Sequence, residues 1–308
     1  MNEYEVPILS IYIPTYNHEN YIRKAIDSVL MQKTTYLYEV LVGEDASTDN
    51  TKKILKEYEK EHPNKIKVFY REKNMYGKKI HNSMDLRLRC KGKYIIALEG
   101  DDYWIDDRKL EKEISFLEKH PDYIAVAHNC QIVDENNHLL NEEYPECKDN
   151  EYTFYHYLLD IMPGQFTTVM MRNPYTQQSF DTSLIDEGLV PGDKAIYFSL
   201  LTSGKIYCIQ NKMSAYRHVT NKGSSYSATY NFNYYSKKHF YDCISRYALQ
   251  SKNLDAVIVA KVQMIVLLRT AFRKKSISLK TFLVELLNVR CSLKVLKYLI
   301  LRDIKIKR

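Results

Sequence analysis

Short apolar runs alternate with segments of helical periodicity in the first third of the chain, and this alternation limits the fold more than any other feature. Each run has the length of a strand and leads through a loop into apolar residues at helical spacing. The expected strands are Ile8 to Ile13, Tyr38 to Val42, Ile66 to Tyr70 and Tyr94 to Leu98. The expected helices are Asn20 to Leu30, Asp49 to Glu61 and Ile80 to Cys90. This order predicts an α/β protein with a mostly parallel, doubly wound sheet.

The fourth run ends in an acidic motif, Glu99-Gly100-Asp101-Asp102, which is followed by Tyr103-Trp104. Open α/β sheets bind their ligands at the carboxyl ends of the strands. The clustered carboxylates repel one another, so an ordered motif of this kind usually needs a cation or cationic partners to hold it. The motif therefore indicates a metal site. The alternative is a solvated acidic turn.

The loop after the first strand, Pro14 to Glu19, lies where a dinucleotide-binding protein would carry its glycine-rich turn. It contains no glycine, which argues against a nicotinamide or flavin site because the backbone cannot approach a pyrophosphate closely. Its aromatic ring, hydroxyl and amide groups suit a base or a sugar. In the alternative interpretation, Thr15 and Asn17 only cap the following helix.

Asp45 ends the second strand and is expected to face the same crevice, where a carboxylate can accept from a uracil N–H or a ribose hydroxyl. The segment after it spaces its oxygen atoms like a calcium loop. Its sixth residue is Asn50 and its twelfth is Lys56, which excludes an EF hand. Thr48 or Asp49 is expected to cap the next helix.

Three further positions carry candidate chemistry in the second half of the chain. A strand is expected over Phe166 to Met171 after a turn, and residues 131–151 are expected to be peripheral. Asp193 begins a helix, either as its cap or as a general base for an acceptor hydroxyl. Arg217 and His218 follow a short strand and suit a diphosphate and its metal, although either is alternatively an ordinary surface charge.

The formal charge of +7 is concentrated in the C-terminal tail. Arg273 to Arg308 contains 11 Lys or Arg residues against 2 Asp or Glu residues, so the rest of the chain is slightly negative. No nucleic acid is therefore expected as a partner. In the last helix, apolar residues follow one face beside cations, which predicts contact with an anionic membrane surface. The alternative is a helix packed on its own domain.

The six cysteines include no C-x-x-C pair and are expected to be reduced thiols. Residues 1–5 lack a signal pattern, and the apolar stretch Leu254 to Leu268 is too short and too interrupted to span a bilayer. We therefore expect a cytoplasmic protein, peripheral on the inner face of the membrane.

Taken together, these motifs resemble those of the inverting family-two glycosyltransferases with a GT-A fold. The resemblance rests on Ser10 to Asn17, on Asp45 with Ser47, Asp49 and Thr51, on Leu98 to Trp104, on Gly192-Asp193 and on Tyr216-Arg217-His218. It implies a GT-A domain over residues 1–228, with a Rossmann-like sheet flanked by helices. Residues 229–308 would form a helical, basic C-terminal extension.

The resemblance also implies roles for individual residues. A nucleotide-sugar donor, with UDP as the expected nucleotide, would bind to Pro14, Thr15, Tyr16, Asn17, Asp45, Asp101 and Arg217. The ligands of Mn²⁺ or Mg²⁺ would be Asp102 and His218. Asp193 would be the catalytic base, and Trp104 would contact the acceptor or, alternatively, would be a packed aromatic. The family has Asp where this chain has Glu99, so a contribution of Glu99 to the metal site is left open.

The expected function is metal-dependent, inverting transfer of a sugar to a hydroxyl of a saccharide or lipid-linked acceptor in cell-surface polysaccharide synthesis. The alternative is a noncatalytic module that binds a nucleotide sugar or a polyanion and keeps the same fold.

Overall fold

The computed structural model describes residues 6–78, 80–177, 179–218 and 232–306. Its strands are β1 (Leu9–Thr15), β2 (Tyr38–Glu44), β3 (Ile66–Tyr70), β4 (Tyr94–Ala97), β5 (Tyr103–Trp104), β6 (Tyr123–Val133), β7 (Glu151–Tyr152), β8 (Met170–Arg172) and β9 (Lys205–Arg217). They form one sheet in the order β3-β2-β1-β4-β8-β6-β9-β5, and β7 pairs with β9.

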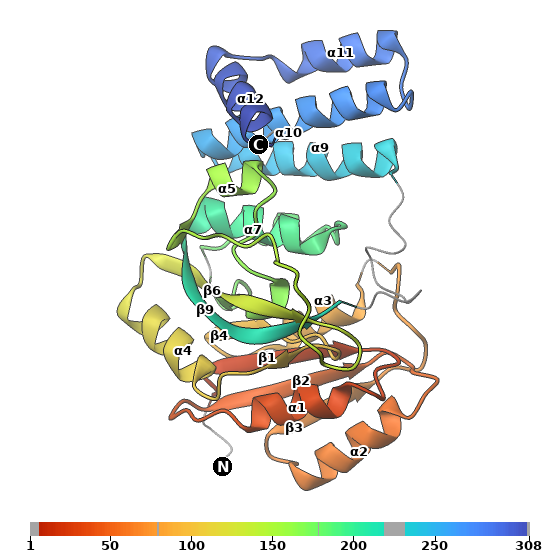
Figure 1. Cartoon of the computed structure of the whole chain (residues 1–308), viewed down its shortest axis with the longest axis vertical. Coiled ribbons are helices and arrows are strands. Elements are labelled where there is room, and N and C mark those ends of the chain that lie inside the picture. The colour runs from red at the N-terminus through yellow and green to blue at the C-terminus, as the bar shows by residue number, and fades with distance from the viewer. Residues whose placement is uncertain (1–5, 79, 178, 219–231, 307–308) are drawn as a thin grey trace.

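Helices flank this sheet and continue beyond it at one end (Figure 1). Those within the α/β part are α1 (Ile22–Leu30), α2 (Thr51–Glu61), α3 (Asn82–Arg89), α4 (Lys109–Lys119), α5 (Phe154–Leu158), α6 (Ser183–Asp186) and α7 (Gly192–Ser203). A stack of four follows: α9 (Tyr234–Gln250), α10 (Leu254–Arg273), α11 (Leu279–Val289) and α12 (Leu293–Ile306).

The first half of the sheet is parallel, as predicted. β1 lies between β2 and β4, and β2 also pairs with β3. Side chains of β1 alternate between two core clusters: Ile11 and Ile13 pack with the α1 side, whereas Tyr12 belongs to the other cluster. Because the strands are parallel, their carboxyl ends lie along one edge, where the loops after β1, β2 and β4 meet.

The second half of the sheet is mixed and differs from the expected strands. The strand expected over Phe166 to Met171 begins as a 3₁₀ turn, Phe166–Thr168, because the Gln165 side chain accepts a hydrogen bond from the Thr167 N–H at 2.7 Å. β8 then pairs antiparallel with β4 and β6. The short strand expected before Arg217 is the end of a longer strand, β9, whose pairing with β6 contains register shifts.

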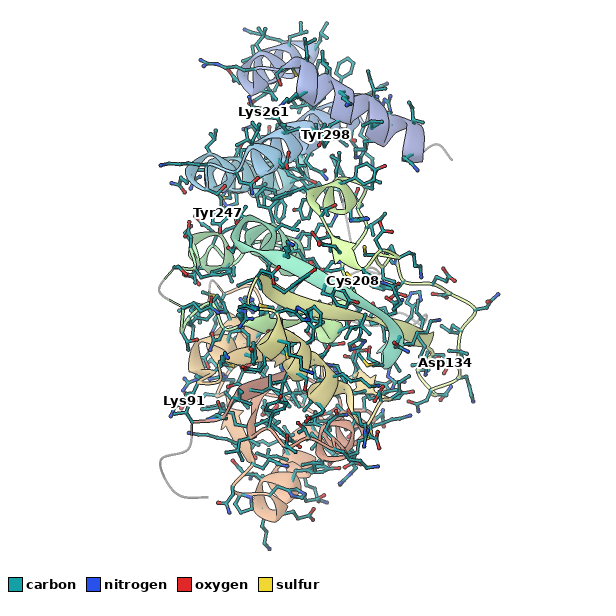
Figure 2. All side chains as sticks on the ribbon, turned by 90° about the vertical axis from the view of Figure 1, so that its left-hand side faces the viewer. Lys91, Asp134, Cys208, Tyr247, Lys261 and Tyr298 are labelled. Carbon is teal, nitrogen blue, oxygen red and sulfur yellow. The ribbon has the colours of Figure 1, made fainter. Side chains whose placement is uncertain are left out.

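The C-terminal helices pack on the α/β part through α5, α6 and α7. Phe240 and Ile244 of α9 share a core cluster with Phe198 of α7. Figure 2 labels Tyr247, a residue of α9. Its hydroxyl lies 2.9 Å from Ser199 Oγ and donates to the Asp181 carbonyl at 3.1 Å. The predicted domain boundary at residue 228 lies outside the described residues. Among the helices that the structure describes, none is long and apolar enough to cross a bilayer.

Candidate active site

Two polar loops meet at the carboxyl ends of β1 and β2. Asn17 has a left-handed backbone, with φ of 55°, a conformation that asparagine adopts more readily than most residues. Its Oδ1 accepts from the Thr48 N–H at 2.8 Å, and its own N–H donates to Ser47 Oγ at 3.0 Å. α1 begins after Tyr21 without a side-chain cap. Asn17 therefore ties the two loops together and does not cap α1.

Asp45 is buried one residue beyond β2. Its N–H donates to the Thr15 carbonyl at 3.0 Å, and its Oδ1 accepts from the Met75 N–H at 2.9 Å. Burial raises the pKa of this carboxyl, and the hydrogen bond from Met75 opposes that effect. Tyr16, next to Thr15, is 40% exposed, so its ring is available to a ligand at the same edge of the sheet.

The acidic motif packs directly against the loop after β1. The Gly100 N–H donates to the Pro14 carbonyl at 3.3 Å. A Cβ atom on Gly100 would lie 2.5 Å from His18 Nδ1 and 2.8 Å from Thr15 Oγ1, distances too short for a side chain to fit without displacing them. Glycine therefore lets the motif and the loop form one wall of the site, as their order in the sequence suggested.

Asp102 is buried at the end of this motif. Its Oδ1 accepts from the Arg217 N–H at 2.8 Å. Its Oδ2 accepts from Gln165 Nε2 at 3.2 Å and from Thr167 Oγ1 at 3.5 Å. Burial, followed by the charge of Asp101, raises the pKa of the Asp102 carboxyl well above its usual range. The carboxylate predicted to be the direct metal ligand is thus already held by three protein donors.

In the part of the chain that the structure describes, the carboxylates of Asp101 and Glu99 have fewer protein partners than the carboxylate of Asp102. The Asp101 side chain is 33% exposed, and its Oδ2 lies 4.0 Å from His18 Nε2. Over the residues that the structure describes, the Glu99 carboxylate has no hydrogen-bond donor. Burial and then the charge of Asp101 raise its pKa to about 8. Carboxylate oxygens are ligands that hard divalent cations such as Mn²⁺ and Mg²⁺ prefer.

Arg217 braces the acidic motif from β9. Its Nε donates to the Asp101 carbonyl at 2.8 Å, its Nη1 to the Asp134 carbonyl at 2.7 Å and its Nη2 to Asn137 Oδ1 at 2.8 Å. The guanidinium also lies 4.4 Å from the centre of the Tyr21 ring, and only 4% of the residue is exposed. These contacts favour a role in holding the motif over the predicted contact with a diphosphate.

His218, the next residue, is held by a carboxylate. Its N–H donates to the Val133 carbonyl at 2.9 Å, and its Nδ1 lies 2.7 Å from a carboxylate oxygen of Glu142. Histidines that bind metals commonly make such a bond with one ring nitrogen and coordinate through the other. The contact with Glu142 is therefore compatible with a ligand role for Nε2.

Asp193 lies in the first turn of α7 but is not its cap, which is Pro191. Its Oδ1 accepts from the Lys194 N–H at 2.8 Å. Burial raises the pKa of this carboxyl, whereas the N–H and charge of Lys194 oppose the rise. The ring of Tyr144 packs edge-on against that of Tyr216, the residue before Arg217, with 5.7 Å between the ring centres. Burial raises the pKa of the Tyr144 phenol.

Trp104 is packed in the core and only 1% exposed. Its backbone N–H donates to Ser28 Oγ at 3.1 Å, and its indole Nε1 donates to the Thr167 carbonyl at 3.4 Å. The ammonium of Lys109 lies 4.3 Å from the centre of the ring. These surroundings favour the packed-aromatic alternative over an acceptor platform.

Sequence reasoning did not identify Tyr144, Gln165 or Thr167 as parts of the site. The segment expected to be peripheral carries Tyr144 as well as buried Glu146. The only signal in the sequence for Tyr144 is that it is an aromatic residue within a polar segment. Gln165 and Thr167 lie in the turn that replaces the expected strand, so their contact with Asp102 depends on that turn.

Comparison with known proteins identifies the family. A sequence profile described as Glycosyl transferase family 2 matches residues 10–176, which include both loops and the acidic motif. The chain belongs to glycosyl transferase family 2. The profile ends before Asp193, Arg217 and His218, so the family match does not cover these residues.

Two curated relatives of this family-2 chain illustrate its range. An uncharacterised protein of Mycobacterium tuberculosis is 30% identical over 210 residues, which are 68% of this chain and 58% of the relative. The putative teichuronic acid biosynthesis glycosyltransferase TuaG of Bacillus subtilis is 38% identical over 111 residues, 36% of this chain and 42% of that protein. The chain thus matches less than two thirds of the length of either relative.

Solved structures support the GT-A fold at low sequence identity. Residues 1–349 of S. aureus TarS, in complex with UDP-GlcNAc, match with a TM-score of 0.59 and 17% identity, over 91% of this chain and 79% of that one. GalNAc-T7 with UDP, GalNAc and Mn²⁺ matches with a TM-score of 0.56 and 15% identity, over 81% and 52%. The predicted fold class is confirmed.

Proposed function

We propose that this family-2 chain transfers a sugar from a UDP-sugar to a hydroxyl of a saccharide or lipid-linked acceptor in the synthesis of a cell-surface polysaccharide. The observation that carries the proposal is the contact between the acidic motif and the loop after β1, at the edge of the sheet where the loop after β2 also lies. The UDP-GlcNAc bound to TarS and the name of TuaG support the choice of donor and of product class.

The nucleotide would bind at the edge formed by the loops after β1 and β2. The buried Asp45 carboxylate has one oxygen paired with the Met75 N–H, and the other can accept from an imide N–H of the base. The exposed ring of Tyr16 can stack on the base or the ribose. Thr15 and Pro14 would shape this edge, and Asn17 would keep the two loops together.

A divalent cation, Mn²⁺ or Mg²⁺, would be held by Asp101 and Glu99, with His218 Nε2 as a further ligand. When bound, it would neutralise the charge of the departing diphosphate. Asp102 would hold the motif in shape through Arg217, Gln165 and Thr167. The Mn²⁺ in the GalNAc-T7 structure supports use of a divalent metal at this kind of site.

Asp193 would act as the general base. It would accept the proton of the acceptor hydroxyl while that oxygen forms a bond to the anomeric carbon of the donor. The bond from that carbon to the diphosphate oxygen would break on the opposite face, so that the configuration inverts in one displacement. A raised pKa suits this task, because a base works best when its pKa approaches the working pH.

The acceptor would reach the site on an anionic membrane surface. α11 and α12 expose nine large apolar residues in the described part of the chain: Leu279, Leu283, Val284, Leu287, Leu293, Leu296, Ile300, Leu301 and Ile304. Exposed cations, Lys294 and Lys297 among them, accompany these residues. Apolar residues beside cations on a helix suit binding in the interface of an anionic bilayer.

Sedimentation with vesicles tests the membrane contact. The protein should bind vesicles that contain phosphatidylglycerol more strongly than vesicles of phosphatidylcholine alone. Leu287→Glu combined with Leu293→Glu should abolish binding. Leu249→Glu, at a leucine on α9 that is 65% exposed, should preserve it. Equal binding by both variants would contradict this contact.

Calorimetric titration tests donor binding. UDP should bind in the presence of Mn²⁺, and the heat of binding should be much smaller after a chelator is added. GDP should bind less tightly than UDP. Nucleotide binding without any turnover would favour the noncatalytic module. Absence of nucleotide binding in the presence of Mn²⁺ would overturn the proposed function.

A further inference from the structure

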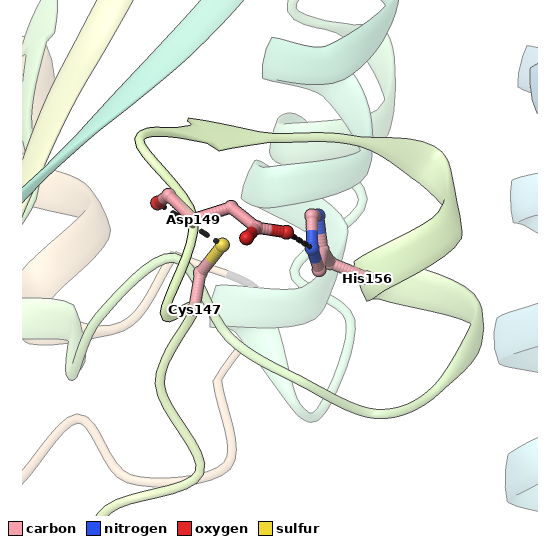
Figure 3. Close-up of side chains that lie close together, drawn as sticks. All are labelled: Cys147, Asp149 and His156. Atoms are coloured by element: carbon pink, nitrogen blue, oxygen red, sulfur yellow. Dashed lines mark hydrogen bonds and ion pairs between the residues drawn. The ribbon is translucent and has the colours of Figure 1, made fainter. Parts of the chain in front are cut away.

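A thiol and a carboxylate from the segment between β6 and β7 converge with an imidazole from α5. The Sγ of Cys147, a carboxylate oxygen of Asp149 and a ring nitrogen of His156 all lie within 4.8 Å of one another. Figure 3 shows the side chains of Asp149 and Cys147 beside the His156 ring. Cys147 and His156 are buried, whereas Asp149 is exposed, so the cluster has an opening to solvent.

Hydrogen bonds orient the imidazole toward the other two groups. His156 Nε2 lies 2.9 Å from Asp149 Oδ2. His156 Nδ1 lies 3.1 Å from Thr153 Oγ1, which can accept its proton and so leave the lone pair of Nε2 for a metal. A metal ion would then replace the proton that His156 and Asp149 share. The Thr153 N–H, which now donates to Nδ1, would lose that acceptor.

Cys208 of β9 lies beside this cluster. It is fully buried and belongs to the same hydrophobic core cluster as Cys147. The Gln210 side chain fixes the two backbones, because its Nε2 donates to the Cys147 carbonyl at 3.4 Å and to the Cys208 carbonyl at 3.1 Å. Both cysteines are free of disulfides.

We propose that Cys147, His156 and Asp149 bind one Zn²⁺ ion. A thiolate, an imidazole and a carboxylate are three protein ligands of the kinds that zinc binds, and they leave the fourth tetrahedral position for water. Mn²⁺ and Mg²⁺ prefer oxygen ligands, which is the composition of the acidic motif. The chain thus carries two metal sites of different chemistry.

The bound zinc would stabilise the segment between β6 and η1, the 3₁₀ turn Phe166–Thr168, and both ends of this segment lie near the active site. Tyr144 lies on the N-terminal side of Cys147, and Gln165, which bonds to Asp102, lies on the C-terminal side of His156. The Cys147 N–H donates to the Met162 carbonyl at 2.7 Å, so the two ends already lie side by side. The zinc site would thus stabilise the positions of these active-site residues without contacting the substrate.

Cobalt titration of the full-length chain, stripped of metal by a chelator, tests the site. We expect one Co²⁺ per chain with thiolate-to-cobalt charge-transfer absorption, displacement of that signal by Zn²⁺, and a higher melting temperature with Zn²⁺. Mn²⁺ should not displace the signal. Absence of thiolate-to-cobalt absorption in the wild-type chain would overturn the proposal.

Matched variants locate the signal. Cys147→Ser and His156→Gln should weaken Co²⁺ binding by more than about tenfold. Cys130→Ser, at another buried thiol, should leave binding unchanged. Cys243→Ser should do the same, although Cys243 lies in the other such group, with Glu187 and His239. Loss of the signal in Cys243→Ser with retention in Cys147→Ser would contradict the assignment.

Far-UV circular dichroism separates loss of the site from loss of the fold. His156→Gln keeps a side-chain oxygen that can accept from Thr153, so it is expected to fold. Lost cobalt absorption with a native spectrum in this variant supports the site, and unaltered absorption contradicts it. If a variant unfolds, the titration of the wild-type chain decides the question alone.

Discussion

The backbone N–H of Arg217 donates to Oδ1 of Asp102 at 2.8 Å and joins the end of β9 to the acidic motif. The side chain of Arg217 repeats this connection, because its Nε donates to the Asp101 carbonyl at 2.8 Å. The motif is therefore a turn braced from a neighbouring strand. The positions of the Asp101 and Glu99 carboxylates therefore depend on residues that are far away in the sequence.

Arg217→Lys should destabilise the protein. A lysine can keep the charge but cannot reach the three acceptors that the guanidinium contacts, so buried acceptors are left unpaired. We expect a loss of about 2 kcal/mol in the free energy of unfolding, measured by urea denaturation. Arg246→Lys, at a side chain that is 61% exposed, should change it by less than about 0.5 kcal/mol. Equal effects would show that Arg217 does not brace the motif.

Asp102→Asn should mainly reduce stability, whereas Asp101→Asn should mainly weaken metal-dependent nucleotide binding. Asn at position 102 can still accept from the Arg217 N–H, but its amide group would face the donors of Gln165 and Thr167. A loss of about 1–3 kcal/mol in stability is expected. Asn at position 101 should instead weaken Mn²⁺-dependent UDP binding with little change in stability. Calorimetry and thermal unfolding of both variants check this, and the reverse pattern would restore Asp102 as the direct ligand.

Gly100→Ala should disturb the wall between the acidic motif and the loop after β1. The added methyl group would meet His18 and Thr15 at 2.5 and 2.8 Å. Overpacking of this kind costs about 1–3 kcal/mol, and nucleotide binding should fall with it. Gly192→Ala is the control, since a Cβ there meets no atom within 4 Å. Similar melting temperatures for the two variants would refute the close packing.

The raised pKa of Asp193 sets the direction of two pH effects. Only the deprotonated carboxylate can accept a proton, so kcat should rise with pH, with an acid limb above the usual aspartate value of about 3.9. The folded state also holds this proton more tightly than the unfolded state does. Asp193 therefore contributes less stability as the pH rises through the raised pKa.

Asp193→Asn provides the measurement for the second effect. The stability of the variant relative to the wild type should increase as the pH is raised from the unfolded-state pKa through the folded-state value. Urea denaturation across this range measures the difference. A constant difference, or a kcat that does not fall at acidic pH, would contradict the raised pKa.

The local part of the structure could be predicted from the sequence. The parallel half of the sheet follows from apolar runs and helical spacing, and Asp45 and the acidic motif lie at strand ends because those patterns are local. Trp104 could not be assigned, because its burial depends on Thr167 and Ser28. Tyr144, Gln165 and the Cys147 cluster were missed for the same reason: turns and a long loop bring them together.

The most direct measurement is turnover of sugar nucleotides by the wild-type chain and by Asp193→Asn. Purified protein should be screened against UDP-, GDP-, CDP- and dTDP-sugars for hydrolysis or transfer, first with Mn²⁺ and then with a chelator. We predict turnover of a UDP-sugar that requires the metal. Asp193→Asn should lose at least about 100-fold in turnover while it keeps metal-dependent UDP binding. Full turnover by Asp193→Asn, or UDP binding by the wild type without any turnover, would contradict sugar transfer with Asp193 as the base.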